Sequence, residues 1–234
     1  MNLPSCPKHY GTSYAAVRYP GHNLWPLKLA THLYRLANTS PKRLLLTLHT
    51  RTPVTSIAPH TPSEAHPTSS PWRWALMTPR GPISCDYIVH ATNAHASHLL
   101  PHMAGPRGIV PTRGQCVAIR ANADLASLTK SGWAANDGFE YWFPRPVSGL
   151  DKTRVGAVDY PLVILGGGRE MSSPRFETYE EDDGAVNEDI GRALRRFLPH
   201  VFPEKFEQGR EPEMEWVSRS WSRRCGSAWL NSIW

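Results

Sequence analysis

One glycine run in this sequence has the residue type and position that could bind a phosphate group. Gly166, Gly167 and Gly168 directly follow the apolar segment 162–165. Glycines between a strand and a helix let backbone amides approach the pyrophosphate of a dinucleotide, but that fingerprint has the spacing GxGxxG and opens a helix. Here the third glycine of the fingerprint is absent, and polar, proline-containing sequence comes after the run. We therefore interpret the run as a tight turn or a close backbone contact.

A histidine-rich stretch could bind a metal ion. Cys85 and four histidines fall within eighteen residues, and His95 and His98 would share one face of a helix over 93–100. The spacing matches no common zinc template, and Pro101 interrupts the helix. We therefore predict solvated or core histidines and no metal site.

Three common enzyme motifs are absent, and a basic segment near the C-terminus favours a nucleic-acid-binding protein as an alternative. The lack of GxxxxGK[ST] excludes a P-loop nucleotidase, and the lack of HExxH and GxSxG weakens the zincin and α/β-hydrolase interpretations. The net charge of +6, from 26 basic and 20 acidic residues, suits a nucleic acid, an anionic cofactor or an acidic substrate alike. Arginine and tryptophan residues of segment 217–234 could bind single-stranded nucleic acid, so a basic nucleic-acid-binding protein is one alternative. They are Arg219, Trp221, Arg223 and Arg224.

The first half of the chain, which must position these groups, is predicted to hold helices and short strands. From Leu24, apolar residues recur at helical spacing, and Pro26 suits a first helical turn. The run 87–91 is apolar without interruption, which is typical of a strand inside a parallel sheet, so this half is predicted to be α/β. The predicted strands are 43–50, 54–57, 72–77 and 83–91, and a short helix is predicted over 93–100.

The second half of the chain is predicted to be antiparallel. The segments 109–119, 139–144 and 162–166 have strand character and are joined by loops instead of helices, which favours an α+β arrangement. A helix is predicted over 186–198, and the four acidic residues at 180–183 complement the dipole at its N-terminus.

Cysteine usage and hydropathy favour a soluble protein of a reducing compartment. The four cysteines lie far apart and form no CxxC pair, which favours free thiols. The N-terminal residues lack the apolar stretch of a signal peptide, and no run approaches about 18 apolar residues. We therefore expect a cytoplasmic protein that does not contact a membrane.

Six segments occur in an order that resembles a known family. They read LWPLKL at 24–29, TPVTSI at 52–57, YIVHATNA at 87–94, VPTRGQ at 110–115, YWFPRP at 141–146 and ILGGGR at 164–169. This series resembles the FAD-dependent oxidoreductases of the D-amino-acid oxidase, glycine oxidase and sarcosine oxidase type, over residues 10–216. The resemblance implies an incomplete FAD-binding Rossmann-like domain over 1–105, a mostly antiparallel substrate domain over 106–216 and an atypical tail over 217–234.

The resemblance also implies which residues contact FAD. The backbone of Val54 and Thr55 would meet the adenine edge. The small residues of 91–93 would lie beside the dinucleotide, with an ordinary strand end and a helix N-cap at Asn93 as the alternative. Residues 113–115 would lie near the isoalloxazine ring, with a surface strand and a glycine bulge as the alternative. The implied cofactor contacts are Val54, Thr55, Ala91, Thr92, Asn93, Arg113, Gly114 and Gln115.

The resemblance further implies a reaction and a substrate contact. Tyr141 would place its hydroxyl in the substrate cavity, and a core aromatic position is the alternative. The implied reaction is oxidation of a C–N bond in an amine or amino acid, with hydride transfer to the flavin and reoxidation by dioxygen. The implied partner is this small molecule and no nucleic acid, and no residue is assigned as a catalytic acid or base.

Two departures from the family pattern leave another alternative open. The family's N-terminal β-α-β unit with GxGxxG would lie upstream of Met1. The family's Glu-Trp pair, here Glu215 and Trp216, usually precedes glycine-rich, threonine-containing sequence, which segment 217–234 does not resemble. Without the phosphate-binding turn we expect weak FAD binding or none. The alternatives to an active oxidoreductase are therefore a non-functional truncated fragment and the basic nucleic-acid-binding protein.

Overall fold

The chain forms two compact units. The computed structural model describes residues 22–39, 46–60, 72–125, 127–128, 131–135, 139–146, 160–172, 175–225 and 228–231, with side chains up to residue 218. The larger unit comprises Met1–Leu24 and Pro111–Trp221, and the smaller unit comprises Trp25–Val110 and Ser222–Trp234. The domain boundary that the sequence places between residues 105 and 106 stays a prediction.

Among the described residues, most of a six-stranded sheet belongs to the larger unit, and its last strand falls in the range 222–234 that is assigned to the smaller unit. Its strands are β4 (Val110–Arg120), β5 (Trp133–Ala135), β6 (Glu140–Pro144), β7 (Leu162–Gly167), β8 (Met214–Cys225) and β9 (Ala228–Asn231), in the spatial order β5-β6-β7-β4-β8-β9. All strand pairs of this sheet whose register is described are antiparallel. The antiparallel sheet predicted for the second half of the chain is therefore confirmed.

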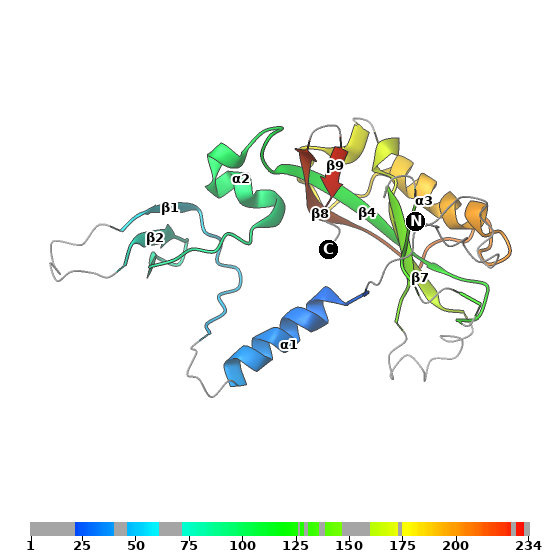
Figure 1. Ribbon diagram of the computed structural model, residues 1–234, viewed down its shortest axis with the longest axis horizontal. Coiled ribbons are helices and arrows are strands. Elements are labelled where there is room, and N and C mark those ends of the chain that lie inside the picture. Colours follow the sequence, from blue (N-terminus) through cyan, green and yellow to red (C-terminus); the bar gives the residue numbers. More distant parts are fainter. Residues whose placement is uncertain are drawn as a thin grey trace, which may run out of the picture. The chain divides into compact units, whose positions relative to one another are not determined.

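Helix α3 (Glu188–Val201) covers one face of this sheet (Figure 1). Its apolar residues Ile190, Leu194 and Leu198 recur every four positions and are at most 1% exposed. Burial of each side chain contributes about 1.5–3 kcal/mol to folding. They share one core cluster with sheet residues that include Val117, Ile119, Trp142, Val163 and Leu165.

Strand alternation assigns the remaining sheet residues to the opposite face, which we call the second face. In β4, Val117 and Ile119 belong to the core under α3, so Cys116 points to the second face. The register pairs Cys116 of β4 with Gly166 of β7, and it pairs Tyr141 of β6 with the same Gly166. Cys116, Gly166 and Tyr141 therefore lie side by side on the second face.

The smaller unit contains helix α1 and a three-stranded antiparallel sheet. Helix α1 (Pro26–Thr39) begins at the proline that the sequence places in its first turn, and none of its residues is buried. No helix within the described ranges combines the length and apolarity needed to cross a membrane. The sheet has the order β1-β2-β3, with β1 at Ser56–Pro59, β2 at Trp74–Met77 and β3 at Ile83–Cys85. Three short helices come next along the chain: η2 (Asn93–His95), α2 (Ala96–Leu99) and η3 (Pro101–Met103).

The strand predicted over 83–91 is shorter than expected. It ends at Cys85, and Tyr87 and Val89 of the apolar run are 82% and 89% exposed. An uninterrupted apolar run marks a strand that needs neighbours on both faces, and the described part of the smaller unit pairs this run with no strand. Since β1, β2 and β3 pair antiparallel, the prediction of a parallel strand here was wrong for the described residues. The mixed helix and sheet content predicted for the chain is confirmed.

Two other predicted segments differ from the structure. Residues 46–50 of the strand predicted over 43–50 form no strand, and residues 43–45 lie outside the described ranges. The tail over 217–234, which has no apolar period, contains the end of β8 and all of β9. Strand pairing uses backbone groups, so it can occur where side chains show no period.

Candidate functional site

The second face of the larger unit brings a phenol and a thiol together. The hydroxyl oxygen of Tyr141 lies 3.3 Å from Cys116 Sγ, although the two residues are 25 positions apart in the sequence. Gly166 lies beneath the pair, and a Cβ there would be 2.8 Å from Cys116 Sγ and closer still to the Tyr141 hydroxyl. A glycine is therefore required at position 166 for the tyrosine ring to reach Cys116.

Burial keeps both groups protonated. The loss of water raises the pKa of Tyr141 above its ordinary value, and the neighbouring Cys116 raises it further. Burial also raises the pKa of the Cys116 thiol, while the hydrogen bond with Tyr141 acts in the opposite direction. At neutral pH the pair therefore presents a neutral hydroxyl that can donate a hydrogen bond and a thiol of low reactivity.

A positive charge lies near this pair. Burial lowers the pKa of Arg169 because the charged guanidinium loses water, and nearby Tyr141 and Glu170 partly oppose that change. Among the described residues, no ion pair joins Arg169 to a carboxylate. Glu170 Oε2 is buried and has no hydrogen-bond partner in the same ranges. Arg169 is thus a half-buried cation near Tyr141 that a ligand anion could neutralise.

The glycine run forms a tight turn, as its sequence context predicts. Gly167 and Gly168 have φ of +135° and +68°, in the region that favours glycine. A Cβ at Gly167 would overlap the carbonyl oxygen of Phe139, and the Gly168 N–H donates to that oxygen at 3.2 Å. The next helix, η6 (Arg169–Met171), has three residues. The run therefore packs against the start of β6 and does not open a nucleotide-binding helix.

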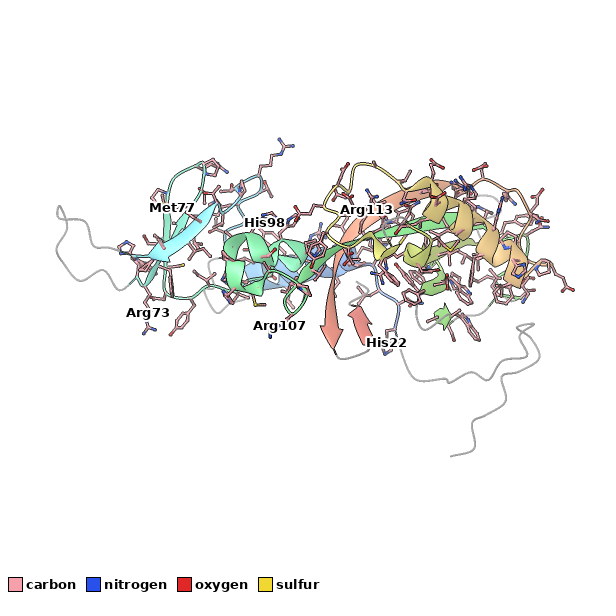
Figure 2. All side chains as sticks on the ribbon, turned by 90° about the horizontal axis from the view of Figure 1, so that it is seen from above. His22, Arg73, Met77, His98, Arg107 and Arg113 are labelled. Atoms are coloured by element: carbon pink, nitrogen blue, oxygen red, sulfur yellow. The ribbon has the colours of Figure 1, made fainter. Side chains whose placement is uncertain are left out.

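The side chain of Arg113, a predicted flavin contact, is bound by protein groups of the segment that precedes α3 in the chain. Its guanidinium forms an ion pair with Glu177, which is 5% exposed. It also donates to the carbonyl oxygens of Asp182 at 2.9 Å and Ala185 at 3.1 Å. Figure 2 labels Arg113 among the side chains. The side chain therefore fixes the segment before α3 to β4.

Gln115 is bound in a similar way, whereas Gly114 points to the second face. The side chain of Gln115 is 2% exposed and donates to Asn187 O at 3.1 Å and to Glu215 Oε1 at 2.6 Å. A Cβ at Gly114 would lie at an ordinary 3.6 Å from Ser218 O. The contact between residues 113–115 and the flavin stays a prediction. Because the side chains of Arg113 and Gln115 bind protein groups, Gly114 and the backbone are the parts of this segment that could contact the flavin.

Val54 and Thr55 lead into β1, an edge strand of the three-stranded sheet. The Thr55 N–H donates to Met77 O at 2.8 Å, and its hydroxyl donates to the same oxygen at 3.1 Å. No hydrogen bond joins the Val54 backbone to another residue within the described ranges. Of the two residues, Val54 is thus the one whose backbone can meet a ligand.

Ala91, Thr92 and Asn93 lead into η2 instead of ending a strand. Asn93 has φ of +48° and is the first residue of η2, so the alternative of an N-cap at Asn93 was wrong. Thr92 precedes the helix, and its Oγ1 is buried without a hydrogen-bond partner in the part of the chain that the structure describes. Buried hydroxyls almost always have a partner, so this atom fits a polar group of a ligand.

The structure groups the predicted site residues unevenly. Gly114 and Tyr141 share the second face of the larger unit, whereas Val54, Thr55 and residues 91–93 belong to the smaller unit. The sequence-based predictions missed the roles of Cys116, Gly166 and Arg169. One signal could have indicated them, because a glycine inside a strand often marks the close approach of another group.

The histidine-rich stretch shows no metal geometry in the described residues. The ring centroids of His95 and His98 are 5.6 Å apart and tilted by 42°. No group of three or more His, Cys, Asp or Glu side chains in those ranges could hold a metal ion.

Comparison with known proteins identifies the family. The sequence profile of the family described as FAD dependent oxidoreductase (DAO) matches residues 4–227. No curated protein matches the chain. A crystal structure from Exiguobacterium sp. 255-15, whose description names protoporphyrinogen oxidase, is similar with 15% identity over 72% of this chain and 34% of that chain, at a TM-score of 0.37. This chain thus spans about a third of the length of that protein. Because the profile covers most of the chain, the chain belongs to the FAD dependent oxidoreductase (DAO) family, and FAD is its expected cofactor.

Proposed function

We propose that this chain is part of an FAD-dependent oxidoreductase that oxidises a C–N bond of an amine or amino acid. In this proposal the smaller unit belongs to a Rossmann-like FAD-binding domain, and the larger unit is the substrate domain. Membership of the family supports the redox chemistry. The observation that carries the substrate class is the desolvated Arg169 near the protonated Tyr141.

Three features of the described residues fit FAD. The Val54 backbone makes no hydrogen bond within the described ranges, so its N–H and C=O could bind the adenine edge. Thr92 Oγ1 is a buried polar atom that could bind a polar group of the cofactor. Gly114 has no side chain that would block the approach of a flat ring to β4. In the described ranges no glycine-rich turn opens a helix of two or more turns, so we assign no residue to the diphosphate.

The chain's own residues would bind and orient the substrate. When bound, FAD supplies the acceptor for a hydride from the carbon next to nitrogen, with dioxygen as the final oxidant. The raised pKa of Tyr141 keeps its proton in place at neutral pH, so its hydroxyl would donate a hydrogen bond to a substrate oxygen. The Arg169 guanidinium would pair with a substrate anion. Neither residue is assigned as a general acid or base.

The guanidinium favours an amino acid over a simple amine. A charge that is taken out of water without a partner is costly, and a carboxylate restores that energy by forming an ion pair. The planar guanidinium can also bind both carboxylate oxygens, which fixes the orientation of the substrate. A simple amine would leave Arg169 desolvated and without such a partner. We therefore propose a small-molecule substrate with a carboxylate next to the reacting carbon.

Titration of the full chain with FAD, followed by a turnover assay at saturating FAD, tests this proposal. Because no residue is assigned to the diphosphate, we expect weak but saturable quenching of flavin fluorescence, and peroxide release that requires both FAD and an amino acid. The absence of saturable FAD binding, together with no peroxide release from any amino acid or amine tested, would contradict the proposed function.

A further inference from the structure

The segment 176–179 of the larger unit has a strained backbone. Phe176, Glu177 and Tyr179 have φ of +72°, +50° and +62°, in the left-handed region that bulky side chains avoid. Such conformations persist where the surrounding structure imposes them, and they concentrate at active sites and ligand clamps. Three of them within four positions therefore point to a function for this segment.

Hydrogen bonds to β4 and to the start of α3 impose this conformation. The Glu177 carboxylate accepts from Arg113 Nε and from Asn187 Nδ2, the latter at 2.7 Å. The Tyr179 N–H donates to Pro111 O at 2.7 Å. The segment is thus anchored at Glu177 and at Tyr179, and Phe176 comes immediately before the first anchor.

The strained conformation places the ring of Phe176 against the ring of Phe139. Their centroids are 5.5 Å apart, with an angle of 30° between the rings. Phe139 also accepts the hydrogen bond from Gly168, the residue before Arg169, and it precedes Tyr141 by two positions. The aromatic pair therefore borders the turn and the strand that carry the two proposed substrate-binding groups.

We propose that the Phe139–Phe176 pair is the surface that selects the apolar part of the substrate. This inference rests on the proposed function, because it places the aromatic pair beside the carboxylate-binding Arg169. Aromatic rings pack well against aromatic and large aliphatic groups. The substrate class is thus an amino acid with an aromatic or large apolar side chain, in preference to glycine or alanine. Neither phenylalanine takes part in the chemical step.

The Phe176→Gly variant tests whether Phe176 selects the substrate without contributing to the stability of the fold. Glycine adopts a φ of +72° without strain, so the variant is expected to keep or exceed the Tm of the wild type. Calorimetry on the full chain at saturating FAD measures the affinity for phenylacetate and the affinity for acetate. We expect wild type to bind phenylacetate about tenfold or more tightly than acetate, and Phe176→Gly to lose most of that ratio. The Phe139→Leu variant, which stays apolar but lacks the ring, is expected to lower the ratio as well.

The Tyr179→Gly variant is the matched control. It relieves the same kind of strain at a side chain that is 58% exposed, and it is expected to leave the phenylacetate-to-acetate ratio unchanged. A wild-type ratio near one, or a ratio that Phe176→Gly does not change, would overturn the inference. A lower Tm with an unchanged ratio would show that Phe176 is structural and would overturn it too. No turnover of any amino acid, together with the expected ratios, would refute the C–N oxidation and still support the aromatic surface.

Discussion

At the scale of single residues, the site depends on one missing side chain. Gly166 leaves the space that the Tyr141 ring occupies, and this brings the phenol to the Cys116 thiol at 3.3 Å. The Cys116 thiol is buried and the Tyr141 phenol is half-buried, the raised pKa of each keeps its proton in place at neutral pH, and Arg169 lies nearby. The second face can therefore bind a ligand through a donated hydrogen bond and a positive charge.

Substitution of Gly166 by alanine tests the packing of this pair. The new methyl group would lie 2.8 Å from Cys116 Sγ and closer to Tyr141, so we expect the free energy of unfolding to fall by about 1–3 kcal/mol. Urea denaturation measures this change. In the control Gly114→Ala, the nearest atom lies at 3.6 Å, and a change within about 0.5 kcal/mol is expected. Equal losses in the two variants would show that crowding by Tyr141 is not the reason for a glycine at position 166.

The raised pKa of Tyr141 predicts a loss of stability at alkaline pH. An unfolded tyrosine ionises near pH ~10, and the folded state holds its proton to higher pH. The unfolded state therefore loses the proton first, so this contribution is complete below about pH 10 and falls as the pH rises above it. Denaturation between about pH 9 and pH 11 should show a shallower decline for Tyr141→Phe than for wild type. Tyr160→Phe, at a position that is 48% exposed, is the control. An identical decline in Tyr141→Phe and wild type would contradict the burial of this phenol.

At the scale of elements, the start of α3 joins the helix to the sheet. The side-chain oxygen of Asn187 accepts from the amides of Asp189 at 3.0 Å and Ile190 at 3.3 Å, which caps the helix. Its amide group donates to Glu177, and its backbone exchanges hydrogen bonds with Gln115. One residue therefore connects α3, β4 and the strained segment that carries Phe176.

The Asn187→Ala variant tests this connection. Loss of the cap and of a partner for the buried Glu177 is expected to lower the free energy of unfolding by about 2 kcal/mol or more. Asp189→Ala is the comparison, because its side chain pairs with Arg192 where both are more than half exposed, and such pairs contribute about 0–1 kcal/mol. Chemical denaturation of both variants gives the two values. A smaller loss for Asn187→Ala than for Asp189→Ala would contradict the role of Asn187.

Helices with a clear local sequence pattern could be predicted, whereas the strands that pair with a given apolar run could not. Helix α3 shows an apolar residue every four positions, and α1 begins at Pro26, so both could be inferred from short stretches of sequence. The run 87–91 shows the limit of such patterns. Its apolar residues indicate a strand that needs burial, but they do not say which strand would supply it.

At the scale of the whole molecule, the family and the expected cofactor were predictable because they depend on the order of segments along the chain. The profile match over residues 4–227 confirms that resemblance. The grouping of Cys116, Tyr141 and Arg169 was not predictable, because it depends on the register of three strands. That register follows from packing across the whole larger unit, and no local sequence pattern specifies it.

The central claim is that the larger unit binds an amino-acid carboxylate at Arg169 for oxidation. The most direct measurement is the kcat/KM for racemic phenylalanine relative to phenethylamine, in the full chain at saturating FAD, for wild type and Arg169→Gln. We expect a wild-type preference for phenylalanine that falls by about 100-fold in Arg169→Gln and is retained in the control Arg192→Gln. A wild-type enzyme without that preference, or one whose preference survives Arg169→Gln, would contradict the claim.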